Sequence, residues 1–403
     1  MDYENSPILP LWEGALDSHA EAHSRPAIAI GKEVKEVWHW VFQTEKSEPI
    51  WKKDPSDNVH RVFELENGVL RWERHTEFWG LTYVGSEPLN DKVTHHVSSL
   101  DASLLTGIRI HFSDSKDGKP DPGLFIGETL LAGRFKNNQV TVFTDFRQQT
   151  NGCVNAWVGG SFIDSADKGR FVKRLIDLEI YRFQVLRGLS FIRPKFIELE
   201  HLERAYSLIT NRLSQEGDTS LDGVIGSFKE LAAKINQLAD NTRYRITATR
   251  AYYNIIKARL DELRETPHGA EQSVAGFIKQ RIDPAHSTVA AFDRRARQLE
   301  RSISTSLRLY NAMIDNDIQK QNQLLLVSMN KRTQQQVRLS KAVEGFSVIA
   351  LTYYGAGLVY YMLSAFETGL DELAVAAAVP LIAAFAWWRT RYSKRRASSE
   401  SDT

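Results

Sequence analysis

The chain has little of what marks a redox protein, a nucleotide-binding protein or a hydrolase. Cys153 is the single cysteine among 403 residues, which excludes an internal disulfide framework and any CxxC metal or redox motif. The sequence has no GxxxxGKS or GxxxxGKT phosphate loop, and its Ser, His and Asp residues form no recognisable nucleophile–base pair. It therefore predicts no enzymatic activity and no cofactor, and it fits a reducing compartment.

An excess of charge of one sign is also absent. The formal net charge is +1, with 25% charged and 42% hydrophobic residues. Because nucleic-acid-binding proteins carry basic patches, nucleic acid is not an expected partner. The N-terminal residues 1–4 (MDYE) are acidic and lack the basic-then-apolar pattern of a secretory signal, so the bulk of the protein is not expected to be exported by a cleaved leader.

Long uncharged runs lie near the C-terminal end of the sequence. Residues 345–366 carry no charged side chain, and as a helix they cover roughly 33 Å, enough for a bilayer core of about 30 Å. Residues 373–388 form a second apolar run of about 24 Å that ends on Trp387 and Trp388, which suit the headgroup level. The two runs predict a transmembrane hairpin. A hairpin buried in a soluble core is the alternative.

The charges around the two runs predict their orientation. The connection between the runs is acidic and contains Glu367, Asp371 and Glu372. The outer flanks are basic, with Lys331, Arg332, Arg338 and Lys341 before the first run and Arg389, Arg391, Lys394, Arg395 and Arg396 after the second. The positive-inside rule places both ends in the cytoplasm. We expect a multi-pass protein of the cell inner (plasma) membrane, with cytoplasmic N- and C-termini and a basic tail at 389–403.

Residues 1–165 contain short segments rich in Val, Ile, Phe and Trp, separated by Gly, Pro and Asp turns. These segments are 34–42, 68–72, 81–84, 107–112 and 139–143. The pattern predicts strands. We therefore expect a cytoplasmic mixed α/β domain, with helices on a mixed sheet, as the first part of an α+β chain.

Residues 166–344 have the apolar periodicity of long helices. The expected helices are 170–189, 195–214, 218–265 and one that begins near Ala285. Apolar residues in the last two repeat at nearly 3.5 spacing, which is typical of a coiled-coil seam. The last helix has no breaker before residue 345, so we expect it to continue into the first membrane span. The apolar stripes predict packing within one chain, association of several chains, or both.

Histidines and carboxylates supply candidate metal ligands. His75 and Glu77 stand two residues apart, and His19 with His23 and His95 with His96 form two further pairs. Such ligands bind zinc or another divalent cation when three or four of them meet. The sequence indicates no third ligand beside His75 and Glu77, which are the candidates for a metal site. The alternative is a charged strand in which Glu73, Arg74, His75 and Glu77 pair with neighbours.

Four segments carry a resemblance to a known family. They are 21–26 (EAHSRP), 71–78 (RWERHTEF), 169–181 (GRFVKRLIDLEIY) and the hairpin region 343–380. They resemble a bacterial family catalogued only as a domain of unknown function, number 3422, and often described as membrane-anchored. The signature residues of the second segment are Trp72, Glu73, Arg74, His75, Thr76, Glu77 and Phe78. The resemblance implies a location at the membrane and no particular reaction.

The order of parts is similar to that of the CorA-type magnesium channel superfamily. In those proteins a cytoplasmic α/β domain precedes long helices, and a stalk helix enters the first of two C-terminal spans. Residues 328–361 correspond to that stalk and span, but the Gly-Met-Asn signature of the superfamily is absent. The resemblance implies a homo-oligomer. In a ring of such helices the candidate pore or gate residues are Leu351, Tyr354, Leu358 and Tyr361.

Three interpretations of function remain open. The first is a homo-oligomer in the lipid bilayer that transports or senses ions, with a divalent cation as candidate ligand. The second is a membrane-anchored scaffold or sensor, whose cytoplasmic domain binds another protein or a small ligand. The third is a membrane-tethered metalloenzyme that uses His75 and Glu77.

Overall fold

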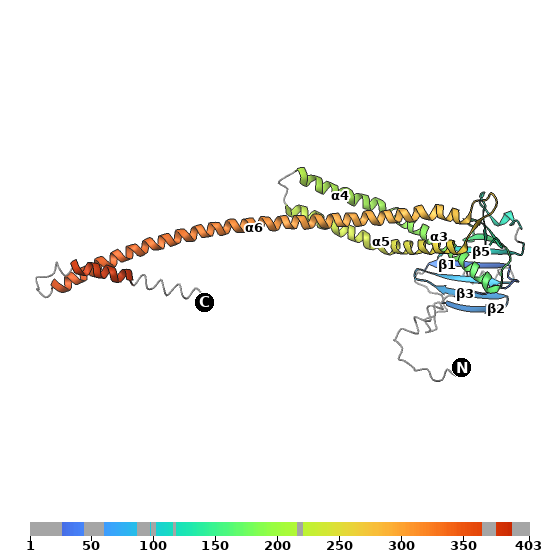
Figure 1. Ribbon diagram of the computed structural model, residues 1–403, viewed down its shortest axis with the longest axis horizontal. Helices are drawn as coiled ribbons and strands as arrows, with labels where there is room; N and C mark the ends of the chain where they lie inside the picture. Colours follow the sequence, from blue (N-terminus) through green and yellow to red (C-terminus); the bar gives the residue numbers. More distant parts are fainter. Residues whose placement is uncertain are drawn as a thin grey trace, which may run out of the picture. The chain divides into compact units, whose positions relative to one another are not determined.

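The computed structural model describes residues 26–43, 60–86, 97, 102–115, 118–215, 221–364 and 376–388. The chain forms two compact units, residues 1–307 and 308–403. A β-sheet and several helices make up the described part of the first unit (Figure 1). The chain is therefore α+β, as the sequence predicts.

The described residues contain a nine-stranded sheet in the order β2-β3-β4-β1-β5-β8-β7-β6-β9. Its strands are β1 (Glu36–Gln43), β2 (His60–Leu65), β3 (Gly68–Arg74), β4 (Phe78–Gly85), β5 (Leu104–Ser113), β6 (Leu131–Phe135), β7 (Val140–Gln148), β8 (Cys153–Gly160) and β9 (Thr266–Pro267). Among these strands, β5 and β8 pair in parallel and the other pairs are antiparallel. The predicted mixed sheet is confirmed, and each of the five predicted strand segments overlaps one of its strands.

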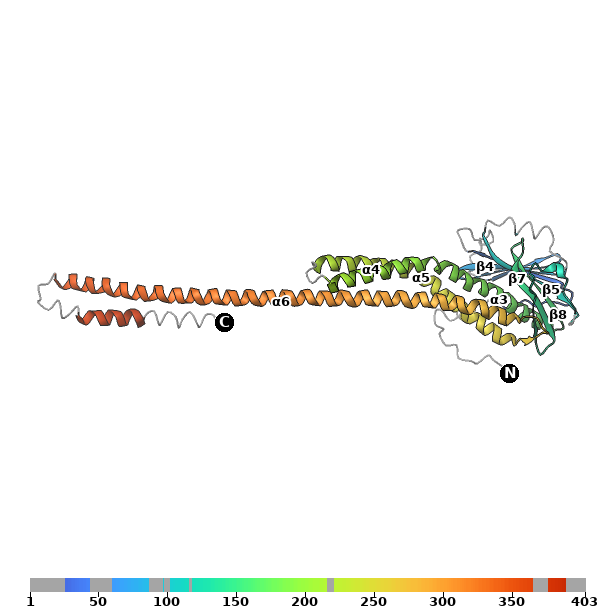
Figure 2. The ribbon, with the colours of Figure 1, turned by 90° about the horizontal axis from the view of Figure 1, so that it is seen from above.

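The helices are α3 (Ser165–Ile192), α4 (Lys195–Gln215), α5 (Leu221–Leu263) and α6 (Val274–Ser364). The first three agree with the expected helices to within a few residues at each end. α3 begins where the Asp164 carboxylate accepts the backbone N–H of Asp167, which satisfies a donor that the first turn leaves free. Helices α3 and α5 cover one face of the sheet (Figures 1 and 2).

The side chains of β1 alternate between the two faces of the sheet, and the two faces differ in composition. Val37 and Val41 belong to the core beneath the helices, together with Phe171 of α3. Trp38 and Trp40 belong to an aromatic cluster on the opposite face. Because successive side chains of a strand point to opposite faces, one strand supplies both layers.

Helix α6 begins earlier than the sequence predicts. The expected start was near Ala285, but the helix begins at Val274 and includes Pro284. The Glu265 carboxylate accepts two backbone N–H groups of the first turn at 2.8 and 2.6 Å. This cap satisfies donors that a helix start leaves free. The start is therefore set by a side chain that precedes the helix, and Pro284 costs one backbone hydrogen bond inside it.

The first part of α6 packs against α4. Phe292 contacts the ring of Phe196 edge-on, with 5.2 Å between ring centroids. The hydroxyl oxygens of Tyr206 and Ser306 lie 3.2 Å apart, and Ile303 is fully buried. Packing within one chain, one of the two outcomes expected of the apolar stripes, is therefore observed in this part of the helix.

The second unit contains the apolar end of α6 and a shorter apolar helix, Ala376–Trp388. Among the described residues, α6 is the one helix long and apolar enough to cross a membrane; its apolar 18-residue window has a mean hydropathy of 1.3 and no buried residue. The two helices lie side by side in both views (Figures 1 and 2). They approach closely at Gly355, where an added Cβ would lie 3.1 Å from the Ile382 side chain.

Candidate functional site

The helix-facing side of the sheet carries a row of polar side chains inside the core. Arg71 of β3 stands opposite Thr82 of β4, and Thr82 stands opposite His39 of β1. Glu73 lies on the same face, two residues after Arg71. All four side chains are buried. Because buried polar groups are costly unless they are paired, their partners decide what this row does.

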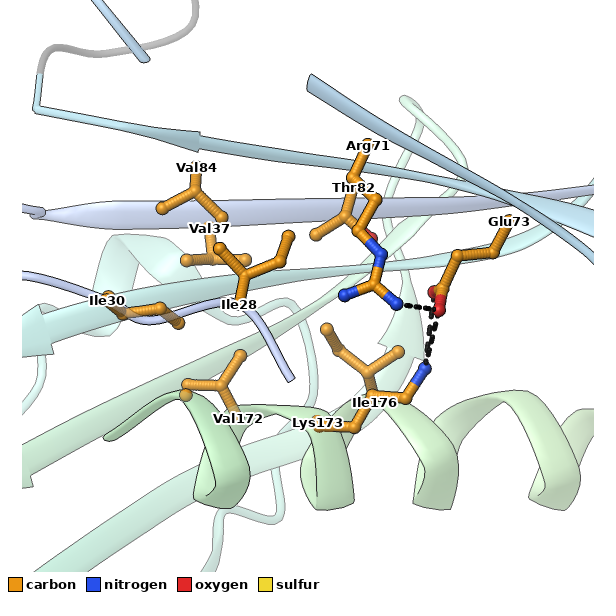
Figure 3. A pocket seen from close by; sticks show the side chains of 11 residues that line it. Ile28, Ile30, Val37, Arg71, Glu73, Thr82, Val84, Val172, Lys173 and Ile176 are labelled. Atoms are coloured by element: carbon orange, nitrogen blue, oxygen red, sulfur yellow. Dashed lines mark hydrogen bonds and ion pairs between the residues drawn. The ribbon is translucent and has the colours of Figure 1, made fainter. Parts of the chain in front are cut away.

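Glu73 contacts two basic side chains, Arg71 and Lys173 (Figure 3). Its carboxylate accepts a hydrogen bond from the Arg71 guanidinium at 2.5 Å, and the Lys173 ammonium of α3 donates to both carboxylate oxygens at 3.2 Å. Arg71 also donates to the backbone carbonyl of Pro26. Burial opposes the charge of Glu73, but Lys173 and Arg71 outweigh it and hold the pKa of Glu73 below its ordinary value. The Glu73 carboxylate thus joins β3 to α3, and the Arg71 that binds it joins β3 to the segment that leads to β1.

A second carboxylate joins the turn between β3 and β4 to α5. Glu77 accepts a hydrogen bond from the Tyr252 hydroxyl at 2.9 Å and lies 2.6 Å from the Arg245 guanidinium. Burial and the neighbouring Glu77 both raise the pKa of Tyr252, which keeps its hydroxyl protonated as a donor. The Tyr252 ring also stacks on Tyr181 of α3, with 5.4 Å between centroids.

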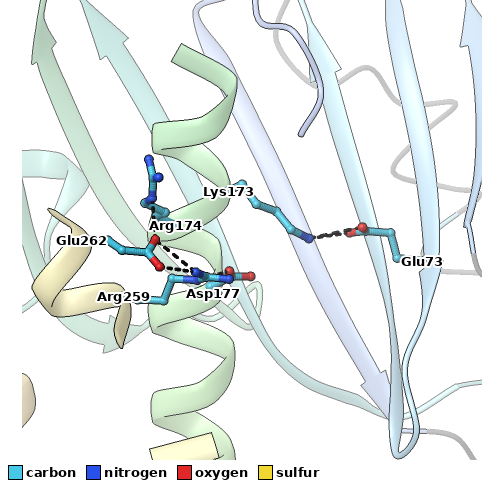
Figure 4. Close-up of polar contacts among 6 residues, drawn as sticks. All are labelled: Glu73, Lys173, Arg174, Asp177, Arg259 and Glu262. Atoms are coloured by element: carbon cyan, nitrogen blue, oxygen red, sulfur yellow. Dashed lines mark hydrogen bonds and ion pairs between the residues drawn. The ribbon is translucent and has the colours of Figure 1, made fainter. Parts of the chain in front are cut away.

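Further ion pairs join α3 to α5 (Figure 4). Arg259 of α5 donates to Asp177 of α3 at 2.8 Å, and Arg174 of α3 donates to Glu262 of α5 at 2.9 Å. Arg259 and Glu262 also pair within α5. Burial raises the pKa of Asp177 although Lys173 and Arg259 lie nearby. We call these contacts, with those of Glu73 and Glu77, the charge network; it fixes the two helices to each other and to the sheet.

The space beside Glu73 is too small for a substrate. A cavity lined by Ile28, Val37, Arg71, Glu73 and Lys173, among others, has a volume of about 20 Å³ (Figure 3). A cavity needs about 10–15 Å³ of such volume to hold one water molecule. The cavity therefore has room for one water beside the charge network.

The imidazole of His39 and the hydroxyl of Thr82 lie within hydrogen-bond distance of each other. The His39 Nδ1 lies 2.8 Å from the Thr82 Oγ1. Burial lowers the pKa of His39 to about 3, so the ring is neutral, and its Nε2 has no hydrogen-bond partner in the described part of the chain. The ring fills the space over Gly80, where an added Cβ would lie 2.7 Å from its Cε1. Because both side chains are buried, the pair is closed to a substrate.

The predicted metal candidates lie in the turn between β3 and β4 and not on a strand. His75 stacks on Phe78 with 4.4 Å between ring centroids, while Glu77 is engaged by Arg245 and Tyr252. No three His, Cys, Asp or Glu side chains gather to hold a metal ion among the residues described. Ion pairing, the alternative for this segment, is observed for both of its carboxylates. Outside the described residues lie His19, His23, His95 and His96.

Three of the four segments that carry the family resemblance meet at the charge network. Pro26 ends the first segment, Arg71–Phe78 is the second, and Gly169–Tyr181 of α3 is the third. α3 approaches closely here, because an added Cβ on Gly169 would lie 1.9 Å from the carbonyl oxygen of Ile28. The other signature residues take different places: Trp72 lies in the aromatic cluster, Phe78 in the core beneath the helices, and Thr76 is exposed in the turn.

Glu36 gathers a smaller group of charges on the opposite face of the sheet. Its Oε1 lies 2.6 Å from the Arg109 guanidinium and 3.2 Å from the His111 Nδ1. The Trp38 indole N–H donates to its Oε2 at 3.2 Å. Burial opposes ionisation, but the contacts with His111 and Arg109 prevail and lower the pKa of Glu36 from 4.5 to about 2.

Glu36 therefore makes the stability of the first unit depend on pH. Because its pKa is lower in the folded state, its contribution is complete above about pH 4.5 and is lost as the pH falls through about 2. A shift of this size corresponds to about 3 kcal/mol. We expect Glu36→Gln to lower the free energy of unfolding by at most about that amount at pH 5 and by less towards pH 3. Urea unfolding of both proteins at several pH values measures this, and a difference that does not change with pH would contradict it.

The candidate gate residues lie on α6 in the second unit. Leu351, Tyr354, Leu358 and Tyr361 are all more than half exposed. Residues four and seven apart share one face of a helix, so Tyr354, Leu358 and Tyr361 form a single apolar face.

The sequence matches the model of one family, described as "Protein of unknown function (DUF3422)", over residues 17–397. No curated protein and no solved structure matches the chain. The similarity to CorA-type channels in the order of parts therefore stays a prediction, as do ion transport and self-association.

Proposed function

The chain belongs to the DUF3422 family, and we propose that it is a membrane-anchored scaffold or sensor whose first unit binds a partner outside the bilayer. The observation that carries this proposal is the exposure of the apolar end of α6. Phe346, Ile349 and Tyr353 are 73, 67 and 74% exposed, although they belong to an uncharged run. A continuous apolar surface of this kind is unfavourable in water and favourable in hydrocarbon.

The backbone of the second unit also suits a bilayer. A helix satisfies its own backbone hydrogen bonds, which hydrocarbon requires of any spanning segment. The close approach of Gly355 to Ile382 is typical of helices that pack through small residues in lipid. These features support an insertion of both apolar helices as a multi-pass anchor in the inner (plasma) membrane.

The first unit has the properties of a binding platform. The charge network fixes α3 and α5 on the sheet, and two hollows have the size of ligand pockets. A hollow of about 580 Å³ lies between α4 and α5 and is lined by residues that include Ile197, His201 and Leu231. A second, of about 410 Å³, lies where β5 and β8 end and α3 begins, beside Phe112 and Lys168. Hollows of this size suit a small ligand or a segment of a partner protein.

A channel built from several copies is the second candidate. The exposed face formed by Tyr354, Leu358 and Tyr361 supports it, since such a face lines the axis when equivalent helices form a ring. Cross-links between subunits through single cysteines at these three positions would favour the channel. A monomeric mass in mild detergent would favour the scaffold.

The proposed anchor predicts a defined topology. By the positive-inside rule, the bases that flank the two apolar runs and the acids between them predict that both termini are cytoplasmic. A reporter fused after Thr403 is expected to be active on the cytoplasmic side, and a tag inserted between Glu367 and Glu372 is expected to be labelled from outside intact cells. An external reporter signal at Thr403 would contradict the proposed hairpin.

A further inference from the structure

Acidic and basic side chains are unevenly distributed along the exposed part of α6. Two of the acids in its earlier part pair with bases one turn away. Arg297 lies 3.0 Å from Asp293, and Lys320 lies 3.5 Å from Asp317. Residues 321–343, by contrast, contain four bases and no acid. Between residue 321 and the apolar run the helix therefore carries four bases and a single acid, Glu344, which directly precedes the run.

These four bases are Lys331, Arg332, Arg338 and Lys341. All are exposed, and none forms an ion pair within the part of the chain that the structure describes. Like charges close together on a helix repel each other, at a cost of a few tenths of a kcal/mol per pair. The segment therefore favours a partner that supplies negative charge.

The position of each base relative to the apolar run decides which of them reach a bilayer. At a rise of 1.5 Å per residue, Lys341 lies about 6 Å before Gly345 and Arg338 about 10 Å before it. Lys331 and Arg332 lie about 20 Å before the same residue. The headgroup layer on either side of the hydrocarbon core is about 5–8 Å thick. With their long side chains Arg338 and Lys341 reach this layer, whereas the other two bases stand beyond it.

We propose that Arg338 and Lys341 bind the anionic headgroups of membrane lipids. This inference rests on the proposed insertion of the apolar end of α6. A guanidinium forms two parallel hydrogen bonds to a phosphate, and an ammonium binds it as a compact charge. The two residues are three apart, so they share one face of the helix and act on the same headgroup or on adjacent ones.

A second copy of the chain does not supply the missing negative charge. Copies that insert in the same orientation would place the segment 331–341 of one beside the same segment of the other. That arrangement sets four bases of one copy against four of the other, and the one acid beside them in each copy, Glu344, leaves an excess of positive charge. An anionic lipid surface supplies the opposite charge at the depth where Arg338 and Lys341 stand, and its attraction is lost within about one Debye length.

The lipid selectivity of the full-length protein in vesicles tests the proposal. The probes are spin-labelled phosphatidylglycerol and spin-labelled phosphatidylcholine in phosphatidylcholine vesicles, and the spectra report how much of each is immobilised at the protein. We expect a several-fold preference for the anionic probe at low salt, reduced in 1 M NaCl. The double variant R338Q/K341Q is expected to lose most of this preference. Its matched control, K331Q/R332Q, removes the same two residue types and is expected to keep most of it.

The two double variants and the two lipid probes together distinguish the possible outcomes. Equal losses of preference in the two double variants, or no loss in either, would overturn the lipid site, because position along the helix would then not matter. The bases at 389–396 are unchanged in both variants, so they do not account for a difference between them. Absence of an immobilised fraction for either probe would instead mean that the apolar run is outside the bilayer, which overturns the proposed anchoring and the lipid site with it.

Discussion

Arginine at both Leu351 and Leu358 is expected to release the protein from membranes. These side chains are 56 and 64% exposed and lie in the apolar run 345–366. One arginine near the centre of a span opposes insertion by about 2.5–3.5 kcal/mol. Two of them therefore lower the insertion equilibrium more than about 1,000-fold. The measurement is the share of full-length protein that stays in the membrane pellet after an alkaline wash.

The matched control changes two apolar residues of the same helix before the run. Val337 and Leu339 are 48 and 67% exposed, so arginine there is equally free of packing conflicts. We expect the variant V337R/L339R to stay in the pellet. Retention of L351R/L358R to the same extent would show that the apolar run does not anchor the protein.

Alanine at Glu73 is expected to be among the most destabilising single changes in the first unit. The side chain is 2% exposed, and its carboxylate neutralises both Arg71 and Lys173. Its removal leaves two cations in the core without their carboxylate, and breaking a buried pair in this way typically costs about 3–5 kcal/mol. Urea unfolding of the full-length protein in mild detergent, followed by tryptophan fluorescence, measures the loss.

Glu262 provides the control for this change. It also pairs with two basic side chains, Arg174 and Arg259, but its side chain is 39% exposed. Exposed ion pairs contribute about 0–1 kcal/mol, because water screens them. We expect Glu262→Ala to lower the free energy of unfolding by no more than about 1 kcal/mol. A loss as large as that of Glu73→Ala would show that burial does not set the importance of the charge network.

The strands and helices with strong local patterns could be predicted from the sequence. The segment 107–112 alternates within β5, and α5 keeps its apolar period over its full length, because both patterns arise from neighbours along the chain. β8 has a weaker pattern, because Cys153–Gly160 is rich in small residues and is almost wholly buried. It therefore lacks the alternation of apolar and polar residues that a strand with one solvent-exposed face shows. The start of α6 was missed because its cap, Glu265, lies beyond a turn and the chain reverses between them.

The charge network could not be predicted, because its partners are far apart in the sequence. Glu73 and Lys173 are separated by 100 positions, and Glu77 and Tyr252 by 175. The available signal was local: Arg71 and Glu73 place charges on alternate positions of an otherwise apolar strand. Such a pattern indicates charges on one face of the sheet, and only the packing of α3 and α5 shows that this face is buried.

Spin labels along α6 test most directly whether its apolar end lies in a bilayer. Cys153 is buried and burial raises its pKa to about 12, so it does not compete with an introduced cysteine for the label. Single labels at Phe346, Leu351 and Leu358 in vesicles are compared with one at Lys331. The proposed anchor predicts high access to oxygen and low access to a water-soluble nickel complex at the first three positions, and the reverse at Lys331. Equal access to nickel at all four positions would contradict it.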